Sequence, residues 1–303
     1  MKHLLFISIF ILLSPVFAQK EGIISKEKTA PIYYKTFGEG EPLLIINGGP
    51  GFNCNGFEAL AKRLASENHC KTILYDQRGT GKSVLTKLDS TTITLELMVE
   101  DMERLRKHLK LRKWNIMGHS FGGMLAAAYL SKYPKRVKSV VFSASGGIDL
   151  GLLAYVSDSI SAKMTAKERA DLQAAAKKIS EGDTSYTTKL ARTTALGSAY
   201  LYDKKHLSVI AKRLTEGNPT ITDLVWDDLE RIKFDCTEKL AKLSTPTLII
   251  QGRDDVIDLP TAQRTQQTLK NSTLILLDNC GHYGWLDAEY SYYQAIRSFL
   301  SKK

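Results

Sequence analysis

The segment that most constrains the fold of this chain is a glycine-rich turn, Gly-His-Ser-Phe-Gly-Gly, at residues 118–123. It directly follows a largely apolar run at 114–117 and directly precedes an apolar helical stretch. This order places Ser120 on a sharp strand-to-helix turn, which is the context that a nucleophile elbow requires. A side chain at Gly118 or Gly122 would collide with the neighbouring strand or helix while the serine is held in a strained conformation. The sequence therefore predicts an accessible serine hydroxyl at the end of a strand.

A serine hydroxyl is a poor nucleophile at neutral pH, so this hypothesis requires a base and an acid that orients the base. His282 follows a predicted strand at 273–278, and we interpret it as the base. Asp255 follows a predicted strand at 246–251 and is the preferred acid; Asp254 and Asp258 stay open as alternatives.

The chain has six histidines, and position argues against the others as the base. His119 lies on the turn itself, so we expect its ring to point away from the serine hydroxyl and to pack beneath the turn. His206 lies in a predicted helical insertion, and we expect it at the surface. The remaining histidines are in the N-terminal segment, before a strand or at the end of a helix.

Acyl transfer also needs hydrogen-bond donors for the negative oxygen that forms on the carbonyl. The predicted strand at 43–47 ends in Asn-Gly-Gly-Pro-Gly at 47–51. Such a turn can direct the N–H of Gly49 at a reacting carbonyl, and the N–H of Phe121 would be the second donor. These two groups are the predicted oxyanion hole.

With these motifs in place, the sequence resembles the proline iminopeptidase branch of the α/β hydrolases. That family has His-Gly-Gly-Pro-Gly at the oxyanion loop and Asp-Gln-Arg-Gly-x-Gly-x-Ser on the next strand and turn. The second motif stands intact at residues 76–83, whereas the first departs from the family at Asn47. The resemblance runs from about residue 30 to the C-terminus, apart from an inserted region. It implies an α/β-hydrolase fold and release of an N-terminal residue, often proline, from a short peptide.

Residues 76–83 also have a direct physical interpretation. Asp76 and Arg78 can tie the turn to neighbouring loops through charge-assisted hydrogen bonds, and glycines allow the chain to turn sharply. We interpret this segment as scaffold for the rim of the site, with direct substrate contact as the alternative.

Apolar strands and amphipathic helices alternate along most of the chain. The predicted strands lie at 43–47, 71–76, 113–118, 137–143, 246–251 and 273–278. Their nearly continuous apolar character is typical of a parallel sheet covered on both faces, so we predict an α/β fold, preceded by an antiparallel hairpin that includes residues 32–34. The predicted organisation is a signal peptide at 1–18, the first part of the core at 19–148, a helical cap at 149–243, and the second part of the core at 244–303.

The cap is expected to select the substrate, and its sequence is the least informative. Glu216, Trp226 and Glu230 are candidate substrate-binding residues, because cap carboxylates hold a substrate ammonium in the proline iminopeptidases that this chain resembles. Asp223, Asp227 and Asp228 are further candidates of the same kind. The structural alternative is that the acids form a solvated helix face and that Trp226 belongs to the core of the cap.

The N-terminal segment 1–18 combines a basic start, an apolar stretch and small residues before Gln19. This pattern predicts a signal peptide and export to the periplasm or the medium. No later segment is apolar for long enough to predict a membrane span.

The formal net charge is +10, but the basic residues are scattered and lack the aromatic interleaving or long blocks of a nucleic-acid groove. We therefore expect no nucleic-acid partner. The spacing of histidines and cysteines indicates no metal site. Among the four cysteines, a bridge between Cys236 and Cys280 and free buried thiols both stay open, whereas the helix between Cys54 and Cys70 argues against a bridge there.

The sequence thus predicts a serine hydrolase that needs no cofactor and acts on a short-peptide or other small-molecule substrate. The leading interpretation is an aminopeptidase, and the alternative is an esterase or lactonase for small esters or amides. A non-catalytic binding protein on the same fold is disfavoured because every expected catalytic position is filled. The sequence leaves the oligomeric state open.

Overall fold

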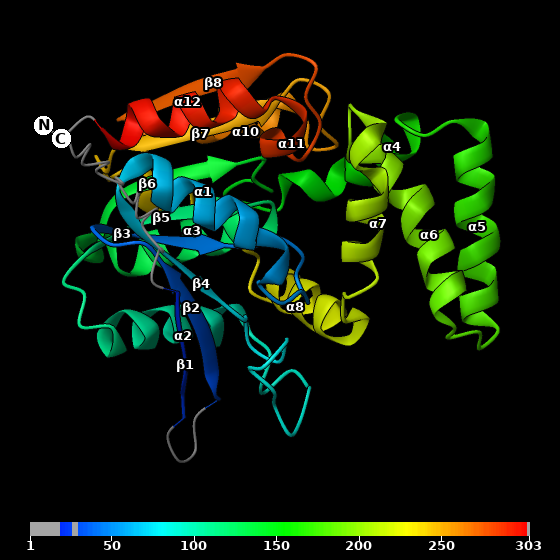
Figure 1. Cartoon of the computed structure of the whole chain (residues 1–303), viewed down its shortest axis with the longest axis horizontal. Coiled ribbons are helices and arrows are strands. Elements are labelled where there is room, and N and C mark those ends of the chain that lie inside the picture. Colours follow the sequence, from blue (N-terminus) through cyan, green and yellow to red (C-terminus); the bar gives the residue numbers. More distant parts are fainter. Residues whose placement is uncertain (1–18, 26–29, 302–303) are drawn as a thin grey trace, which may run out of the picture.

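The computed structural model describes residues 19–25 and 30–301, so the predicted signal peptide lies outside the described residues. Its centre is an eight-stranded sheet in the order β1-β2-β4-β3-β5-β6-β7-β8 (Figure 1). The strands are β1 (Lys20–Ile24), β2 (Ile32–Phe37), β3 (Glu41–Ile46), β4 (Cys70–Tyr75), β5 (Trp114–His119), β6 (Val137–Ser143), β7 (Thr247–Gly252) and β8 (Ser272–Leu277). The strands from β3 to β8 are parallel, whereas β1 and β2 form an antiparallel hairpin and β2 pairs antiparallel with β4. The predicted α/β fold is confirmed, and each predicted strand starts and ends within two residues of the observed one.

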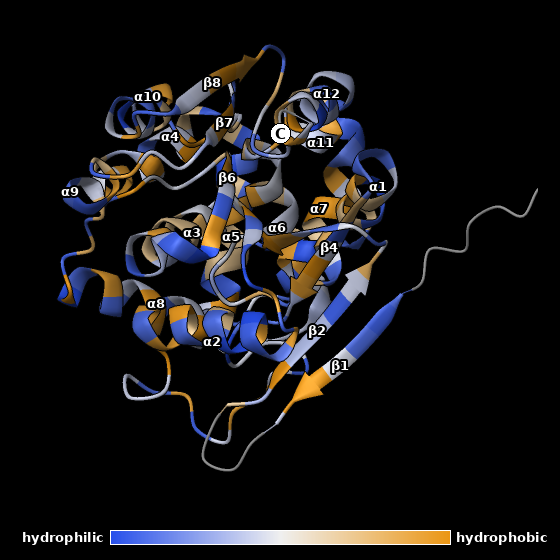
Figure 2. Ribbon diagram, turned by 90° about the vertical axis from the view of Figure 1, so that its left-hand side faces the viewer, coloured by the Kyte–Doolittle hydropathy of each residue, from blue (hydrophilic) through white to orange (hydrophobic). Residues whose placement is uncertain are grey.

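Side chains of the parallel strands alternate between two hydrophobic clusters, one on each face of the sheet. In β3, Leu44 and Ile46 belong to one cluster, and Leu43 and Ile45 to the other. All four are fully buried, which is why the strand is a continuous apolar run in the sequence. Figure 2 shows the same contrast, with a largely hydrophobic β4 inside and hydrophilic residues on the edge strand β1.

Helices cover both faces of the sheet. Side chains from α1 and α12 belong to one cluster, and side chains from α2, α3 and α10 belong to the other. The bounds of these helices are α1 (Glu58–Asn68), α2 (Leu95–His108), α3 (Phe121–Lys132), α10 (Leu259–Thr268) and α12 (Glu289–Leu300), and the short α11 (Gly284–Asp287) precedes α12. The helix α2 begins where the Thr94 hydroxyl accepts a hydrogen bond from the Leu97 N–H at 3.2 Å, and it ends in a basic turn.

Between β6 and β7 the chain is helical. The helices there are α4 (Val156–Ala162), α5 (Ala166–Ser180), α6 (Tyr186–Ala199), α7 (Leu207–Leu214), α8 (Pro219–Arg231) and α9 (Thr237–Leu240). We call α4 to α8 the cap; α9 packs against α3 of the core. Figure 1 shows α5, α6 and α7 side by side at one end of the molecule, beyond the strands, with α8 below α7 on the side of the core.

All four cysteines are buried, and none of them forms a disulfide within the described part of the chain. Cys54, Cys70 and Cys280 pack in the cluster that contains α1 and α12, whereas Cys236 packs in the opposite cluster. The two clusters lie on opposite faces of the sheet, so the bridge between Cys236 and Cys280 that the sequence left open is not formed.

Candidate active site

Ser120 sits between β5 and α3 in a strained backbone conformation, with φ of 55° and ψ of −125°. A methyl group added to Gly118 would lie 2.7 Å from the Cα of Gly123, and one added to Gly122 would lie 2.8 Å from the carbonyl oxygen of Asn47. Real Cβ atoms do not approach other atoms so closely, so the turn requires both glycines, as the sequence predicted. The backbone therefore presents the Ser120 side chain above the end of the sheet.

His282 and Asp255 lie on loops that follow β8 and β7, and their side chains are buried and in contact. Asp255 Oδ1 lies 2.8 Å from His282 Nδ1. With Nδ1 engaged there, the other ring nitrogen, Nε2, is the one available for proton transfer. Of the three aspartates considered from sequence, the structure brings Asp255 to the histidine. Asp258 instead accepts a hydrogen bond from the Ser159 hydroxyl at 3.3 Å.

Gln251, which sequence reasoning did not single out, holds the Asp255 carboxylate in place. Its Nε2 donates to Asp255 Oδ2 at 2.8 Å and to the carbonyl oxygen of Ile257 at 2.9 Å. The backbone N–H of Ile257 donates to Asp255 Oδ1 at 3.1 Å. Gln251 lies at the end of the buried strand β7, where the other side chains are mostly apolar. A polar amide in such a run is the one feature of the sequence that could have indicated its role.

The predicted oxyanion loop lies directly against Ser120. A methyl group added to Gly48 would lie 2.8 Å from the Ser120 Cβ. Phe121 is the first residue of α3, so its N–H belongs to the unpaired donors at the start of a helix. Among the described residues, neither the N–H of Gly49 nor that of Phe121 has a backbone acceptor. Within that part of the chain, both N–H groups therefore lie near Ser120 without a backbone partner, which is what the predicted oxyanion hole requires.

Asn47, the residue that departs from the family motif, stabilises the same loop. Its side-chain Nδ2 donates to the carbonyl oxygens of Gly48 at 3.0 Å and Phe52 at 3.1 Å. Its own carbonyl oxygen accepts a hydrogen bond from Gln77 Nε2 at 2.8 Å. The asparagine therefore ties the loop to its own backbone, and Gln77 of the intact motif at 76–83 ties it to the neighbouring strand end.

His119 is buried beside His282, with ring centroids 4.6 Å apart. It also packs against Phe57, Tyr283 and Trp285. Its Nδ1 has no hydrogen-bond partner among the described residues. Burial, and then the charge of a protonated His282, hold the pKa of His119 well below the usual value of 6.5. His119 is therefore a neutral ring in the wall of the site, nearer to the proposed base than the sequence indicated.

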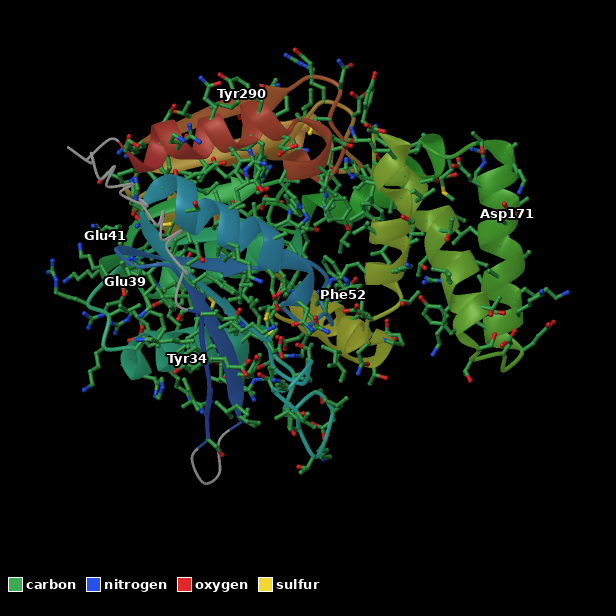
Figure 3. The ribbon with its side chains drawn as sticks, viewed as in Figure 1. Tyr34, Glu39, Glu41, Phe52, Asp171 and Tyr290 are labelled. Atoms are coloured by element: carbon green, nitrogen blue, oxygen red, sulfur yellow. The ribbon has the colours of Figure 1, made fainter. Side chains whose placement is uncertain are left out.

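A cavity of about 420 Å³ lies between the core and the cap, and Ser120, His119 and His282 line it. Most of its other lining residues are apolar or aromatic: Phe52, Phe57, Leu60, Tyr200, Val209, Ile210, Leu214, Tyr283, Trp285, Leu286 and Tyr293. Figure 3 shows Phe52 at the junction between the core and the cap. His206 also lines this cavity, although it was expected at the surface.

None of the three cap residues predicted to bind substrate lines this cavity. Glu216 lies next to it but is paired with Arg213 at 2.5 Å. Trp226 packs against Phe121 at the start of α3, with ring centroids 6.3 Å apart, so this ring contact is with the hydrolase core. Glu230 lines a different depression that also includes Asp149.

Asp228, a further cap acid considered from sequence, is also structural. It is buried, and its Oδ2 accepts a hydrogen bond at 2.8 Å from the N–H of Leu95, the first residue of α2. The amphipathic pattern of α8 could not reveal this contact, because the partner lies more than a hundred positions away in the chain.

Among the described lining residues, the one carboxylate is Glu289, which forms an ion pair with Arg63. Arg63 also pairs with Glu67 at 2.6 Å, and its guanidinium lies 3.8 Å from the centre of the Tyr293 ring. No group of three or more potential metal ligands occurs within residues 19–25 and 30–301. A search of the same residues finds no helix with the length and apolar character of a membrane span.

Comparison with known proteins places this geometry in a family. The family model described as the α/β-hydrolase fold matches residues 41–289 of the sequence. A proline iminopeptidase from Lactobacillus crispatus is 30% identical over 280 residues, which cover 89% of this chain and 94% of the relative.

Solved structures show the same fold. A hydrolase from Bacillus anthracis superposes with a TM-score of 0.77 at 19% identity, over 93% of this chain and 99% of that one. An esterase from Exiguobacterium antarcticum gives 0.72 at 20% identity, over 92% of this chain and 99% of that one. With a family model that matches residues 41–289 and a proline iminopeptidase relative that is 30% identical over most of both chains, this chain belongs to the α/β-hydrolase family, in the proline iminopeptidase branch, and is a serine hydrolase.

Proposed function

We propose that the protein hydrolyses its substrate through a covalent acyl-enzyme on Ser120. The observation that carries the proposal is the cavity wall, in which a serine on a strained turn and a histidine bonded to a buried aspartate face the same space. A serine, a histidine and an acid are the groups that nucleophilic acyl transfer needs.

In the proposed reaction, His282 Nε2 takes the proton of the Ser120 hydroxyl while Oγ attacks the substrate carbonyl carbon. The N–H groups of Gly49 and Phe121 stabilise the negative oxygen. The protonated His282, stabilised by Asp255, then gives its proton to the leaving group as the bond to the carbonyl carbon breaks. A water molecule, deprotonated by His282, attacks the acyl-enzyme and releases the acid, and the proton returns to Ser120 Oγ.

For the substrate, the first candidate is the N-terminal residue of a short peptide, often proline. Its support is the intact motif at residues 76–83 and the relatives that are named proline iminopeptidases. An apolar, aromatic cavity of about 420 Å³ also suits a pyrrolidine ring.

The second candidate is a small ester or amide without a free amine, and a specific observation favours it. A substrate ammonium needs an accessible carboxylate, and the only one among the described lining residues, Glu289, is already paired with Arg63. A neutral acyl group needs no carboxylate partner in the wall of the cavity.

A paired assay separates the two candidates. Prolyl arylamide and N-acetylprolyl arylamide differ in whether the amine is free and charged or capped and neutral. An aminopeptidase cleaves the first and refuses the second, whereas equal cleavage of both, or cleavage of simple aryl esters alone, favours the esterase.

The proposal includes export, because residues 1–18 have the pattern of a cleaved signal. Cell fractionation followed by N-terminal sequencing tests this part. A mature chain that begins at or near Gln19 outside the cytoplasm supports export, and a full-length cytoplasmic protein contradicts it.

A further inference from the structure

The cap contacts the oxyanion loop directly, through residues at the end of α7, in the turn that follows and in the first turn of α8. The N–H of Asn218 donates to the carbonyl oxygen of Gly51 at 2.9 Å. The Thr222 hydroxyl can donate to the carbonyl oxygen of Pro50, at 2.9 Å, or to that of Asn218, at 3.0 Å. Backbone groups next to Gly49, a proposed oxyanion donor, are therefore held by residues of the cap.

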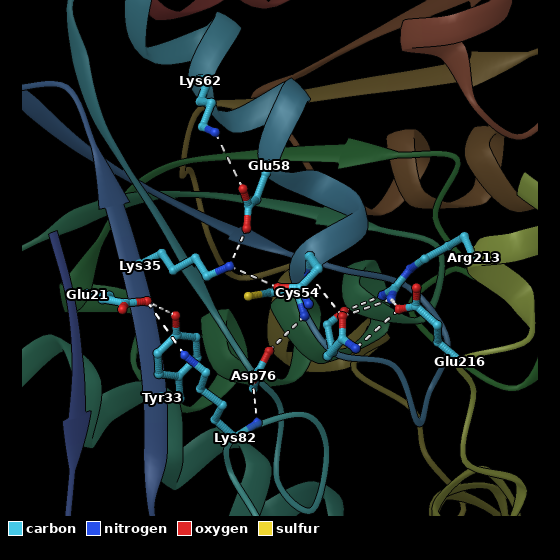
Figure 4. Close-up of polar contacts among 12 residues, drawn as sticks. Glu21, Tyr33, Lys35, Cys54, Glu58, Lys62, Asp76, Lys82, Arg213 and Glu216 are labelled. Carbon is cyan, nitrogen blue, oxygen red and sulfur yellow. Dashed lines mark hydrogen bonds and ion pairs between the residues drawn. The ribbon is translucent and has the colours of Figure 1, made fainter. Parts of the chain in front are cut away.

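Arg213, at the end of α7, makes the most extensive of these contacts (Figure 4). Its Nη1 donates to Asn53 Oδ1 at 2.9 Å, and its Nη2 donates to the carbonyl oxygen of Asn53. Glu216 accepts from the same guanidinium at 2.5 Å and from Asn53 Nδ2 at 3.2 Å. The Arg213 side chain is only 13% exposed. Arg213, Asn53 and Glu216 thus form a closed polar ring between cap and core.

The cap and the core pack closely along this contact. A methyl group on Gly51 would lie 2.6 Å from the Asn218 oxygen, and one on Gly217 would lie 2.7 Å from the Phe52 ring. A methyl group on Gly56 would lie 2.5 Å from Arg213 Nε. The chain therefore has glycine on both sides of the contact, where the two segments approach closely.

Core residues hold the loop from the other side. Asp76 Oδ1 accepts a hydrogen bond from the Cys54 N–H at 2.8 Å, and its Oδ2 accepts from the Lys82 N–H at 2.8 Å. Asn47 and Gln77 fix the beginning of the loop through their side-chain amides. Loss of the contacts from the cap would consequently loosen the loop without releasing it from the core.

We infer that Arg213 and Thr222 are positioning residues that hold the oxyanion loop in its working geometry, so that docking of the cap and stabilisation of the oxyanion are coupled. The inference rests on the proposed function. Neither residue needs to touch the substrate for this role. Most of the Arg213 donors already have protein acceptors, which argues against Arg213 as a receptor for a substrate anion.

The variants Arg213→Gln, Arg213→Lys and Thr222→Val test this inference, with Lys212→Gln as the matched control. Lys212 is an exposed residue of the same helix, and its replacement removes the same charge. Hydrolysis of p-nitrophenyl acetate reports acyl transfer whatever the natural substrate is. Inhibition by phenylboronic acid reports the oxyanion hole, because its adduct with Ser120 resembles the tetrahedral intermediate.

For Arg213→Gln we expect kcat to fall about 10- to 100-fold with little change in KM, since a small misplacement of catalytic groups has effects of this size. The inhibition constant of phenylboronic acid should rise by a similar factor. Arg213→Lys should resemble Arg213→Gln, because an ammonium cannot reproduce the fork of the guanidinium. Thr222→Val should show a smaller loss of the same kind, and Lys212→Gln none.

The inference is overturned if Arg213→Gln raises KM alone, if Arg213→Lys restores full activity, or if boronate affinity stays at the wild-type value. If Arg213→Gln does not fold, the milder Thr222→Val carries the test by the same criteria. Failure of the proposed function would be visible in the wild-type protein, as absence of both ester hydrolysis and boronate binding, whereas failure of this inference would appear only in the variants.

Discussion

At the scale of single residues, the site depends on a buried carboxylate that has partners at both oxygens. Asp255 faces His282 through Oδ1 and Gln251 through Oδ2. The first contact fixes the tautomer of the imidazole, and the second fixes the orientation of the carboxylate. Gln251 therefore acts on the proposed base through Asp255, without contact to the substrate.

Asp255→Asn should lower kcat by about 10⁴, because an amide at this position favours the wrong histidine tautomer while it leaves the packing intact. The adjacent Asp254→Asn is the control and should stay close to wild-type activity. Steady-state kinetics on any accepted ester or arylamide is the measurement. Comparable losses in both variants would contradict the assignment of the acid.

His119 should make folding stability depend on pH. Its pKa is well below 6.5 in the folded protein, so below about pH 6.5 the unfolded chain takes up a proton that the native ring refuses. Stability should therefore fall as the pH drops, by up to about 1.4 kcal/mol per pH unit from this residue, and the residue should contribute nothing above pH 6.5.

Urea unfolding at about pH 7.5 and about pH 5.5 measures this effect, with His119→Phe as the comparison. Phenylalanine keeps an aromatic ring among its aromatic neighbours but cannot titrate. The variant should lose less stability than the wild type between the two pH values. Equal losses would show that His119 is not the residue responsible.

Single residues differ in how far their roles can be predicted from sequence. The strand–turn–helix context allowed the turn around Ser120 to be predicted, because the glycines there are required by close contacts within the turn itself. The roles of Gln251 and Arg213 depend on partners that only the tertiary fold brings near. The cap acids have the charge that a substrate ammonium would need, but charge alone does not predict position: Asp228 contacts the start of α2, and Glu230 lines another depression.

At the scale of elements, the link from β5 to α3 depends on close contact between backbones. Gly118→Ala should destabilise the protein by about 1–3 kcal/mol or more, because the added methyl group meets the backbone of α3 rather than a flexible side chain. Gly197→Ala in α6 is the control. There the nearest atom is a leucine methyl at 3.3 Å, and alanine favours the helix.

Denaturant midpoints of the two variants measure the difference. We expect a clear loss of stability for Gly118→Ala and a change close to zero for Gly197→Ala. Similar stability in both variants would mean that the turn is less tightly packed than the structure indicates.

Element boundaries were predicted closely in the core because strand and helix patterns there are imposed by burial on both faces of one sheet. In the cap, the helical character of the segment at 149–243 was also predicted, and α4 to α8 are its main helices. The packing partners of these helices were not predicted. The pattern of a short amphipathic helix indicates that one face is buried, but it does not identify the element that covers this face.

At the scale of the whole molecule, the parallel sheet brings distant residues together. β5, β7 and β8 run in the same direction, so the loops after them, which carry Ser120, Asp255 and His282, lie at the same edge of the sheet. The cap covers that edge and contributes part of the cavity wall. Hydrophobic patterning predicts strands one at a time and carries no information on which strands are neighbours, so only the family resemblance could indicate how the sheet is ordered.

Trapping the acyl-enzyme tests whether Ser120 is the nucleophile. The protein would be mixed with an activated aryl ester, quenched in acid within the first turnover and digested for mass spectrometry. We predict that the peptide containing Ser120 gains the mass of the acyl group less that of the hydrogen it replaces. Ser120→Ala should show no such gain and should also lose hydrolysis while it stays folded. An acyl group on another residue, or undiminished turnover by Ser120→Ala, would contradict the account.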